Sequence, residues 1–156
     1  MTQYEELIEE LSGDGIDVIE FDFTNDNFHG LYVDGCIAIN KNLSTCEKVL
    51  TAYEEWGHYK TSCGNILDQS TSANRRQEKR ARRWAHDKFM PVERFIDKIL
   101  EIRPVDVWEL IESLDITYPY LCSLVEHYQQ KYGSYKEFEG GCIWFDPIDI
   151  ALYNME

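Results

Sequence analysis

The pattern of hydrophobic and polar positions at the start of the chain predicts a helix followed by a small sheet. Residues 3–11 carry apolar side chains at helical spacing, and Gly13-Asp14-Gly15 then interrupts the pattern. The β-branched stretch 16–21 follows. Two more β-prone stretches, 30–33 and 36–39, flank Asp34-Gly35, a dipeptide that suits a two-residue hairpin turn. We therefore expect a helix, a strand and a small antiparallel sheet.

The middle of the chain is predicted to be helical. Ser44-Thr45-Cys46-Glu47 is a capping-box pattern, in which side chains at the helix start satisfy free backbone amides. The helix that follows has its apolar residues on one face. We expect a polar loop over about 61–73, a second helix over about 74–90, and a third that Pro91 opens. Its apolar stripe would contain Phe95, Ile96 and Ile99.

The last third of the chain predicts two shorter helices, 105–113 and 118–131, and a late strand within 139–146. The fold class is therefore α+β. The sequence contains no repeat and no linker rich in Gly, Ser or Pro, which favours one domain over residues 1–156. Within it, residues 1–100 would hold the sheet and the central helices, and residues 101–156 a helical subregion with a short terminal strand.

Composition and charge narrow the functional classes. Five cysteines form an odd set without a C-x-x-C pair, as expected for reduced thiols in the cytoplasm. The first residues do not resemble an export signal, and no uncharged run reaches a membrane-spanning length. The formal charge of −14, from 15 basic and 29 acidic residues, disfavours direct binding of nucleic acid and favours a partner with a basic face.

Candidate chemistry lies on the first central helix, in Glu54-Glu55-Trp56-Gly57-His58. Glu54 and His58 are four residues apart and therefore project from one side, about 40° apart around the helix axis. The spacing is that of H-E-x-x-H, whose ends bind zinc and whose second residue, here Glu55, is a general base, but the first His is replaced by Glu. A solvated helix face, on which Glu54 and His58 pair weakly, is the alternative interpretation.

Glu78, on the second helix, is the candidate third ligand. It precedes Ala81 and Ala85 by three and seven residues, so it lies on the small, inward-facing stripe of that helix. A carboxylate in that position needs a cation or a metal beside it. An ion pair with Arg82 would satisfy it. Alternatively, Glu78 would complete a site of two carboxylates and one imidazole, with a fourth position open, as in catalytic zinc sites.

Two segments, 50–59 and 77–85, resemble the ImmA/IrrE metallopeptidases of phages, integrative elements and bacterial chromosomes. The resemblance covers residues 16–100 best. It implies a zincin-like fold in which Glu54, His58 and Glu78 bind the metal and Glu55 is the base. It also implies a cytoplasmic endopeptidase that cleaves a helix-turn-helix transcriptional repressor of a phage or mobile element. Glu54 departs from the commoner His of the family.

The ligand set has consequences for the metal. Two carboxylates nearly neutralise a divalent ion, so they should lower the pKa of a bound water less than two imidazoles would. We expect Zn²⁺, and the harder donor set also suits Mn²⁺ or Fe²⁺. The alternative function is a non-catalytic acidic antirepressor that binds and sequesters a basic DNA-binding regulator. Residues 107–121 have the cadence of a helix-turn-helix, but their charges favour a protein-docking surface over a DNA reader.

Overall fold

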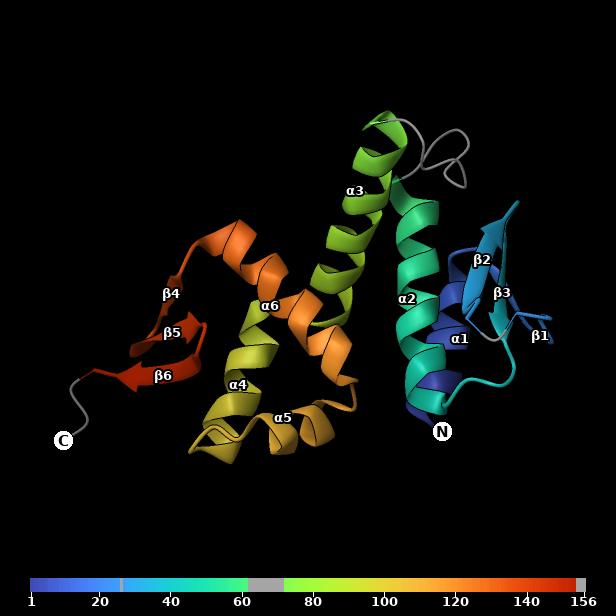
Figure 1. The fold of residues 1–156 in the computed structure, drawn as a ribbon. Coiled ribbons are helices and arrows are strands. Elements are labelled where there is room, and N and C mark those ends of the chain that lie inside the picture. Colours follow the sequence, from blue (N-terminus) through green and yellow to red (C-terminus); the bar gives the residue numbers. More distant parts are fainter. Residues whose placement is uncertain (26, 62–71, 154–156) are drawn as a thin grey trace. The chain divides into compact units, whose positions relative to one another are not determined.

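The computed structural model describes residues 1–25, 27–61 and 72–153, and its class is α+β, as predicted. The chain divides into two compact units, Met1–Phe89 and Met90–Glu156, which are described separately (Figure 1). No helix within the described ranges is long and apolar enough to cross a membrane.

The first unit contains three helices and three strands among its described residues. In chain order these are α1 (Gln3–Gly13), β1 (Asp17–Phe21), β2 (Gly30–Val33), β3 (Cys36–Asn40), α2 (Thr45–Thr61) and α3 (Ser72–Phe89). The predicted capping box is present, because Ser44 N–H donates to Glu47 Oε2 at 3.0 Å and Glu47 N–H donates to Ser44 Oγ at 3.2 Å. Residues 62–71 of the predicted polar loop lie outside the described residues, and the residues on either side of them are helical.

The sheet of this unit has the strand order β1-β3-β2. The predicted hairpin is confirmed: β2 and β3 are antiparallel, and the turn residues Asp34 and Gly35 have φ values of 47° and 82°. The sheet extends beyond this predicted antiparallel hairpin, because β1 joins it parallel to β3 and makes the whole sheet mixed. β3 lies between β1 and β2, so β2 lies at an edge of the sheet.

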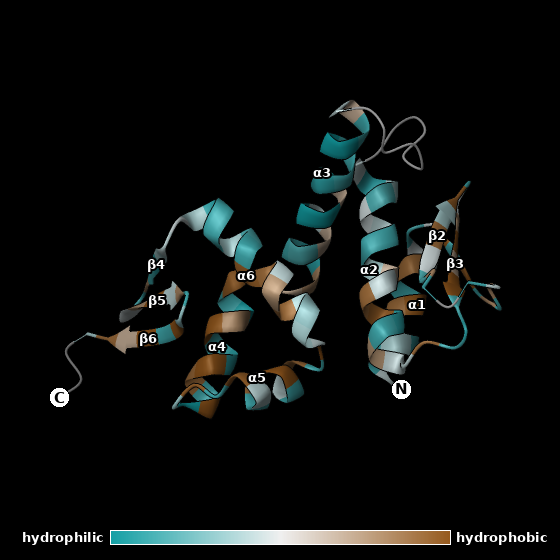
Figure 2. Cartoon of the chain, viewed as in Figure 1, coloured by the Kyte–Doolittle hydropathy of each residue, from teal (hydrophilic) through white to brown (hydrophobic). Residues whose placement is uncertain are grey.

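The two long helices α2 and α3 run side by side (Figure 1) and make the most extensive contact between elements of this unit. Ala52 and Trp56 of α2 and Ala81 and Phe89 of α3 are buried. Most of the remaining surface of α3 is hydrophilic (Figure 2). The apolar stripe of α3 therefore packs against α2, while the arginines and lysines of α3 face the solvent.

The second unit contains the helices α4 (Val92–Ile102), α5 (Val107–Leu114) and α6 (Tyr118–Tyr132), and the strands β4 (Tyr135–Phe138), β5 (Gly141–Phe145) and β6 (Ile148–Leu152). The three predicted helices and the late strand are present. The strands form an antiparallel sheet in the order β4-β5-β6, of which the sequence indicated β5 alone. The core of the unit holds Phe95, Leu124, Tyr128 and Phe145.

Candidate metal centre

The predicted ligands Glu54 and His58 of α2 and Glu78 of α3 lie together. One ligand atom of each residue can be chosen so that all of these atoms lie within 4.8 Å of one another. His58 Nε2 is 3.3 Å from Glu78 Oε2. The side chain of His58 is 6% exposed, that of Glu78 23% and that of Glu54 44%, so the cluster extends from the interior to the surface.

Gly57 explains why the two helices bring these groups so close. A Cβ atom at position 57 would overlap the backbone carbonyl oxygen of Ala81. Ala81 is itself fully buried and small. The backbones of α2 and α3 therefore touch one residue before His58 and three residues after Glu78, which places the imidazole against the carboxylate.

Opposing effects set the protonation of His58. Burial lowers the pKa of its imidazole, but the hydrogen bond with Glu78 and the nearby carboxylates outweigh burial, and the pKa is raised overall. The structure thus favours a positive charge at this point between the helices. An imidazolium and a metal cation both satisfy that preference, because each neutralises the surrounding carboxylates.

Arg82 provides a second positive charge, as the ion-pair interpretation expected. Its Nη2 atom is 3.8 Å from Glu78 Oε1 and also 3.8 Å from Glu54 Oε1. Both distances exceed that of a hydrogen bond, and the side chain of Arg82 is 52% exposed, so the attraction is weak and screened. The ion pair and the three-residue cluster therefore coexist, and Arg82 lies at the outer side of the cluster.

Glu55 is half-buried beside the cluster. Burial is the main cause that raises the pKa of its carboxyl group, to about 7, and Glu54 adds to the rise. His58 and a hydrogen bond from the backbone N–H of Tyr32 act in the opposite direction. The backbone of Tyr32 in the edge strand β2 thus lies close to the Glu55 carboxyl group, a proximity that the sequence analysis did not identify.

The hairpin register explains why Tyr32 reaches Glu55. Val33 and Cys36 close the two-residue turn as a hydrogen-bonded pair, so alternate residues of β2 direct their backbone groups toward β3. Gly30 and Tyr32 direct theirs to the outer edge. Gly30 also packs closely on α2, because a Cβ there would lie 2.6 Å from Thr51 Cγ2 and 3.6 Å from Glu55 Cγ. A face of β2 therefore packs on α2, and the outer edge of the strand passes beside Glu55.

The donor set fits a divalent ion. Zinc binds imidazole nitrogen and carboxylate oxygen at about 2.0–2.2 Å, so two ligand atoms on one ion are separated by up to about 4 Å. Ligand atoms that already lie within 4.8 Å of one another reach that geometry through small side-chain rotations. The cluster could hold one metal ion, and its mixed oxygen and nitrogen donors accept several divalent metals.

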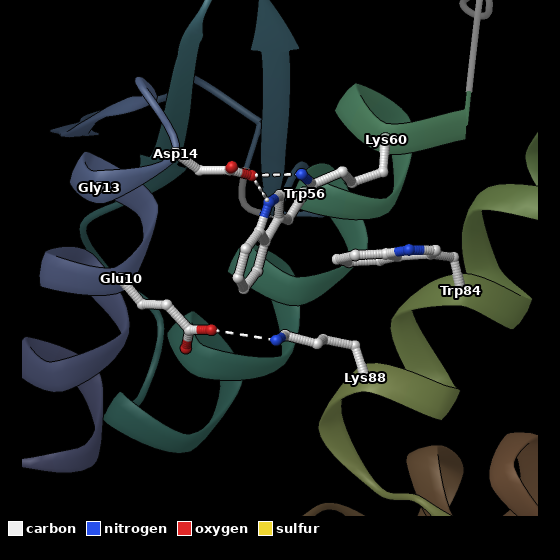
Figure 3. A pocket seen from close by; sticks show the side chains of 7 residues that line it. All are labelled: Glu10, Gly13, Asp14, Trp56, Lys60, Trp84 and Lys88. Carbon is white, nitrogen blue, oxygen red and sulfur yellow. Dashed lines mark hydrogen bonds and ion pairs between the residues drawn. The ribbon is translucent and has the colours of Figure 1, made fainter.

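A pocket of about 390 Å³ lies on another face of α2, among α1, α2 and α3 (Figure 3). Asp14 accepts hydrogen bonds from Trp56 Nε1 and Lys60 Nζ, both at 2.8 Å, and Lys88 Nζ lies 3.0 Å from Glu10 Oε1. The lysines that line this pocket are thus already paired, Lys88 with Glu10 of α1 and Lys60 with Asp14, the residue that follows α1. We interpret the pocket as part of the packing interface between α1 and the helix pair, and we name this interface the seam.

The helix pair α2 and α3 thus gathers two carboxylates and an imidazole that could hold a metal ion, with a further carboxylate beside them. The sequence profile of the IrrE N-terminal-like domain, peptidase family M78, matches residues 12–123, which is more than half of the chain, and the protein belongs to this family. The resemblance to the ImmA/IrrE proteins is thereby confirmed. No curated protein and no solved structure gives a significant match. Family membership supports a metallopeptidase-type function.

Proposed function

We propose that this protein is a zinc-dependent endopeptidase in which Glu54, His58 and Glu78 hold the ion and Glu55 is the general base. The observation that carries the proposal is the convergence of three ligand groups from two helices in a member of a peptidase family. The ion pairs of Arg82 with Glu54 and Glu78 do not require an imidazole in the same cluster, whereas a metal site uses His58 as its third ligand.

Each group near the cluster has a defined task in this proposal. The bound ion supplies Lewis acidity, which makes water a nucleophile near neutral pH. A carboxylate oxygen of Glu55 accepts the proton of that water and delivers it to the leaving amine of the cleaved peptide bond. The backbone N–H of Tyr32 favours the charged form of the Glu55 carboxyl group, which is the form that accepts the proton.

The outer edge of β2 is the natural position for the substrate backbone. An extended peptide can add to an exposed sheet edge through main-chain hydrogen bonds. The backbone groups of Gly30 point to that edge, and Glu55, which interacts with the backbone N–H of Tyr32, lies beside it. A peptide paired with β2 would therefore present its backbone next to the base.

We further propose that the substrate is a helix-turn-helix transcriptional repressor of a phage or mobile element, cleaved in the cytoplasm. The resemblance to the ImmA/IrrE proteins implies this regulatory role, and the formal charge of −14 complements the basic surface of a DNA-binding protein. The same charge would also suit an acidic antirepressor that only sequesters such a regulator. The two functions differ in whether Glu55 is needed.

Replacement of Glu55 by Gln separates these functions because Gln keeps the size of the side chain but cannot accept the proton. Glu55→Gln should retain one metal ion per chain and affinity for the repressor, while cleavage falls by about a hundredfold or more. The substrate for this assay is the helix-turn-helix protein encoded beside the gene. Cleavage, metal content and relief of repression in cells are measured in parallel.

Glu93→Gln, an exposed substitution on α4, serves as the matched control and should leave all three readouts unchanged. If Glu55→Gln relieves repression as well as the unaltered protein does, at equal protein levels, the endopeptidase proposal fails. Sequestration of the regulator would then be the better account.

A further inference from the structure

The second unit exposes a stacked aromatic pair that its core does not use. The side chains of Trp108 on α5 and Tyr118 at the start of α6 are 68% and 50% exposed. Their ring centroids are 5.5 Å apart, with an angle of 27° between the ring planes. The buried residues of α5 are Leu110 and Leu114. Trp108 precedes Leu110 by two residues, so it points about 200° away from the core.

The surroundings of this pair are acidic. Glu109 and Glu112 of α5 are exposed, and Glu112 lies one helical turn after Trp108. Residues 104–130, which include α5 and most of α6, contain five carboxylates and no Lys or Arg. We name the exposed side chains of Trp108, Tyr118, Glu109 and Glu112 the α5–α6 surface.

We propose that the α5–α6 surface docks an arginine-bearing basic segment of the protein substrate. The face of an indole ring attracts a guanidinium group through cation–π contact, and neighbouring carboxylates pair with the same group in a bidentate manner. Exposed Trp and Tyr are also the residues that most often dominate protein interfaces. Charge and aromatic area therefore select the same kind of partner.

Charge also disfavours other occupants. A second copy of the chain would bring this acidic surface against a molecule that also carries −14 charges. Anionic lipid and nucleic acid would be repelled as well. The identification of the basic segment as part of a DNA-binding regulator rests on the proposed function. The docking of an arginine-rich segment is independent of that function, because no residue of the metal centre takes part in it.

The test uses the full chain carrying Glu55→Gln, so that binding is measured without cleavage. The probes are a fluorescein-labelled helical peptide of alanine with arginine at every fourth position, and its lysine counterpart. The arginine peptide should bind more tightly than the lysine peptide, and Trp108→Ala should weaken its binding by about tenfold or more. Trp108→Phe, which keeps an aromatic face, should have an intermediate effect. Fluorescence anisotropy gives the dissociation constants.

Two control variants isolate the surface. Trp144→Ala removes an exposed Trp of β5, 40% exposed, and should leave binding of the peptide unchanged. The pair Glu109→Gln with Glu112→Gln should weaken binding and reduce its dependence on salt. The double variant Glu6→Gln with Glu9→Gln, exposed on α1, removes the same charge elsewhere. It should change peptide binding and its salt dependence much less. Circular dichroism verifies that each variant is folded.

If the protein with Trp108→Ala binds the arginine peptide as tightly as the protein that keeps Trp108, the inference is overturned. Light scattering tests whether the protein self-associates. Self-association that is lost in Trp108→Ala would also overturn the inference, because the surface would then bind a second copy of the chain. With cleavage-competent protein and the repressor, Trp108→Ala should raise KM and leave kcat unchanged. If Glu55→Gln leaves function intact while Trp108→Ala abolishes binding of the peptide, the endopeptidase proposal fails and the docking surface stands.

Discussion

At the scale of single residues, the most informative position is Glu78, because its carboxylate serves two partners. Oε2 lies 3.3 Å from His58 Nε2, while Oε1 lies 3.8 Å from Arg82. The first contact belongs to the proposed metal site and the second to the ion pair that the sequence also indicated. Removing each partner separately shows which of them Glu78 requires.

Glu78→Ala should lose the metal, because an ion with only Glu54 and His58 from the chain is held by two ligands instead of three. Arg82→Ala removes the ion pair and leaves the three ligands, so its metal content should stay close to one ion per chain. Elemental analysis of protein purified without chelator measures both. Full metal in Glu78→Ala would return Glu78 to a role as the partner of Arg82.

At the scale of elements, the contact between α2 and α3 determines the site. Position 57 cannot hold a side chain without a shift of the backbone, because Gly57 lies against the carbonyl oxygen of Ala81 and leaves no space for a Cβ. The neighbour that would have to move is backbone, which cannot rotate away as a side chain does. Any side chain at position 57 must therefore separate the two helices.

Gly57→Ala should consequently lose metal and activity together, and it should destabilise the first unit by about 1–3 kcal/mol, as is common when a packed interior is overfilled. Gly13→Ala is the matched control, because a Cβ there meets nothing within 4 Å. Urea unfolding and metal content are the measurements. Normal metal binding by Gly57→Ala would show that the close approach of the helices is not required.

A second prediction at this scale concerns the seam between α1 and α2. Lys60 and Trp56 hydrogen-bond to Asp14 and lower the pKa of its carboxyl group. A lowered folded-state pKa adds stability above the pKa of the unfolded chain, near 4, and that stability is lost as the pH falls through the folded-state value. Asp14→Asn should therefore unfold more easily than the unaltered protein at pH 7, and the difference should shrink toward low pH.

Urea midpoints across this pH range measure the effect. Asp97→Asn, an exposed substitution on α4, is the control and should show a much smaller difference at pH 7. A constant difference between Asp14→Asn and the unaltered protein at every pH would contradict the assignment of this contact to the charged carboxylate.

Local signals in the sequence account for the parts of the fold that were predicted correctly. The capping box at Ser44 and the turn at Asp34-Gly35 each specify their element within a few residues. The parallel pairing of β1 with β3 joins two segments that are distant in sequence, which local patterns do not reveal. The strands β4 and β6 are neighbours of β5 in the sequence, and the sequence analysis missed the two hairpins that they form with it. The ligand spacing in α2 was readable, whereas the hydrogen bond from Tyr32 to Glu55 required the register of the sheet.

At the scale of the whole molecule, the dominant feature is the excess of negative charge. A formal charge of −14 over 156 residues makes the folded state repel itself, since the acidic groups are closer together there than in the unfolded chain. Ion pairs such as Lys48–Glu20, Lys60–Asp14 and Lys88–Glu10 offset part of this repulsion. Exposed pairs contribute little individually, so repulsion should prevail.

Sodium chloride should therefore raise the melting temperature at neutral pH. Between roughly 0.01 M and 1 M salt the screening length falls from about 30 Å to about 3 Å, which removes most long-range repulsion. Differential scanning calorimetry measures the shift. The same series near the isoelectric pH is the control and should show little or no increase. A falling melting temperature at neutral pH would mean that ion pairs outweigh the net charge.

The three proposed ligands come from two helices, so the stability of the protein should depend on the supply of metal. An ion that binds only when α2 and α3 are packed together stabilises the folded unit through mass action, by about 1.4 kcal/mol for each tenfold rise in free ion above the dissociation constant. The proposed ion would thus act as a reversible cross-link between residues 54–58 and Glu78. Starvation for that ion would expose the unit to unfolding and degradation, so the abundance of the protein, as well as its activity, would follow the metal status of the cell.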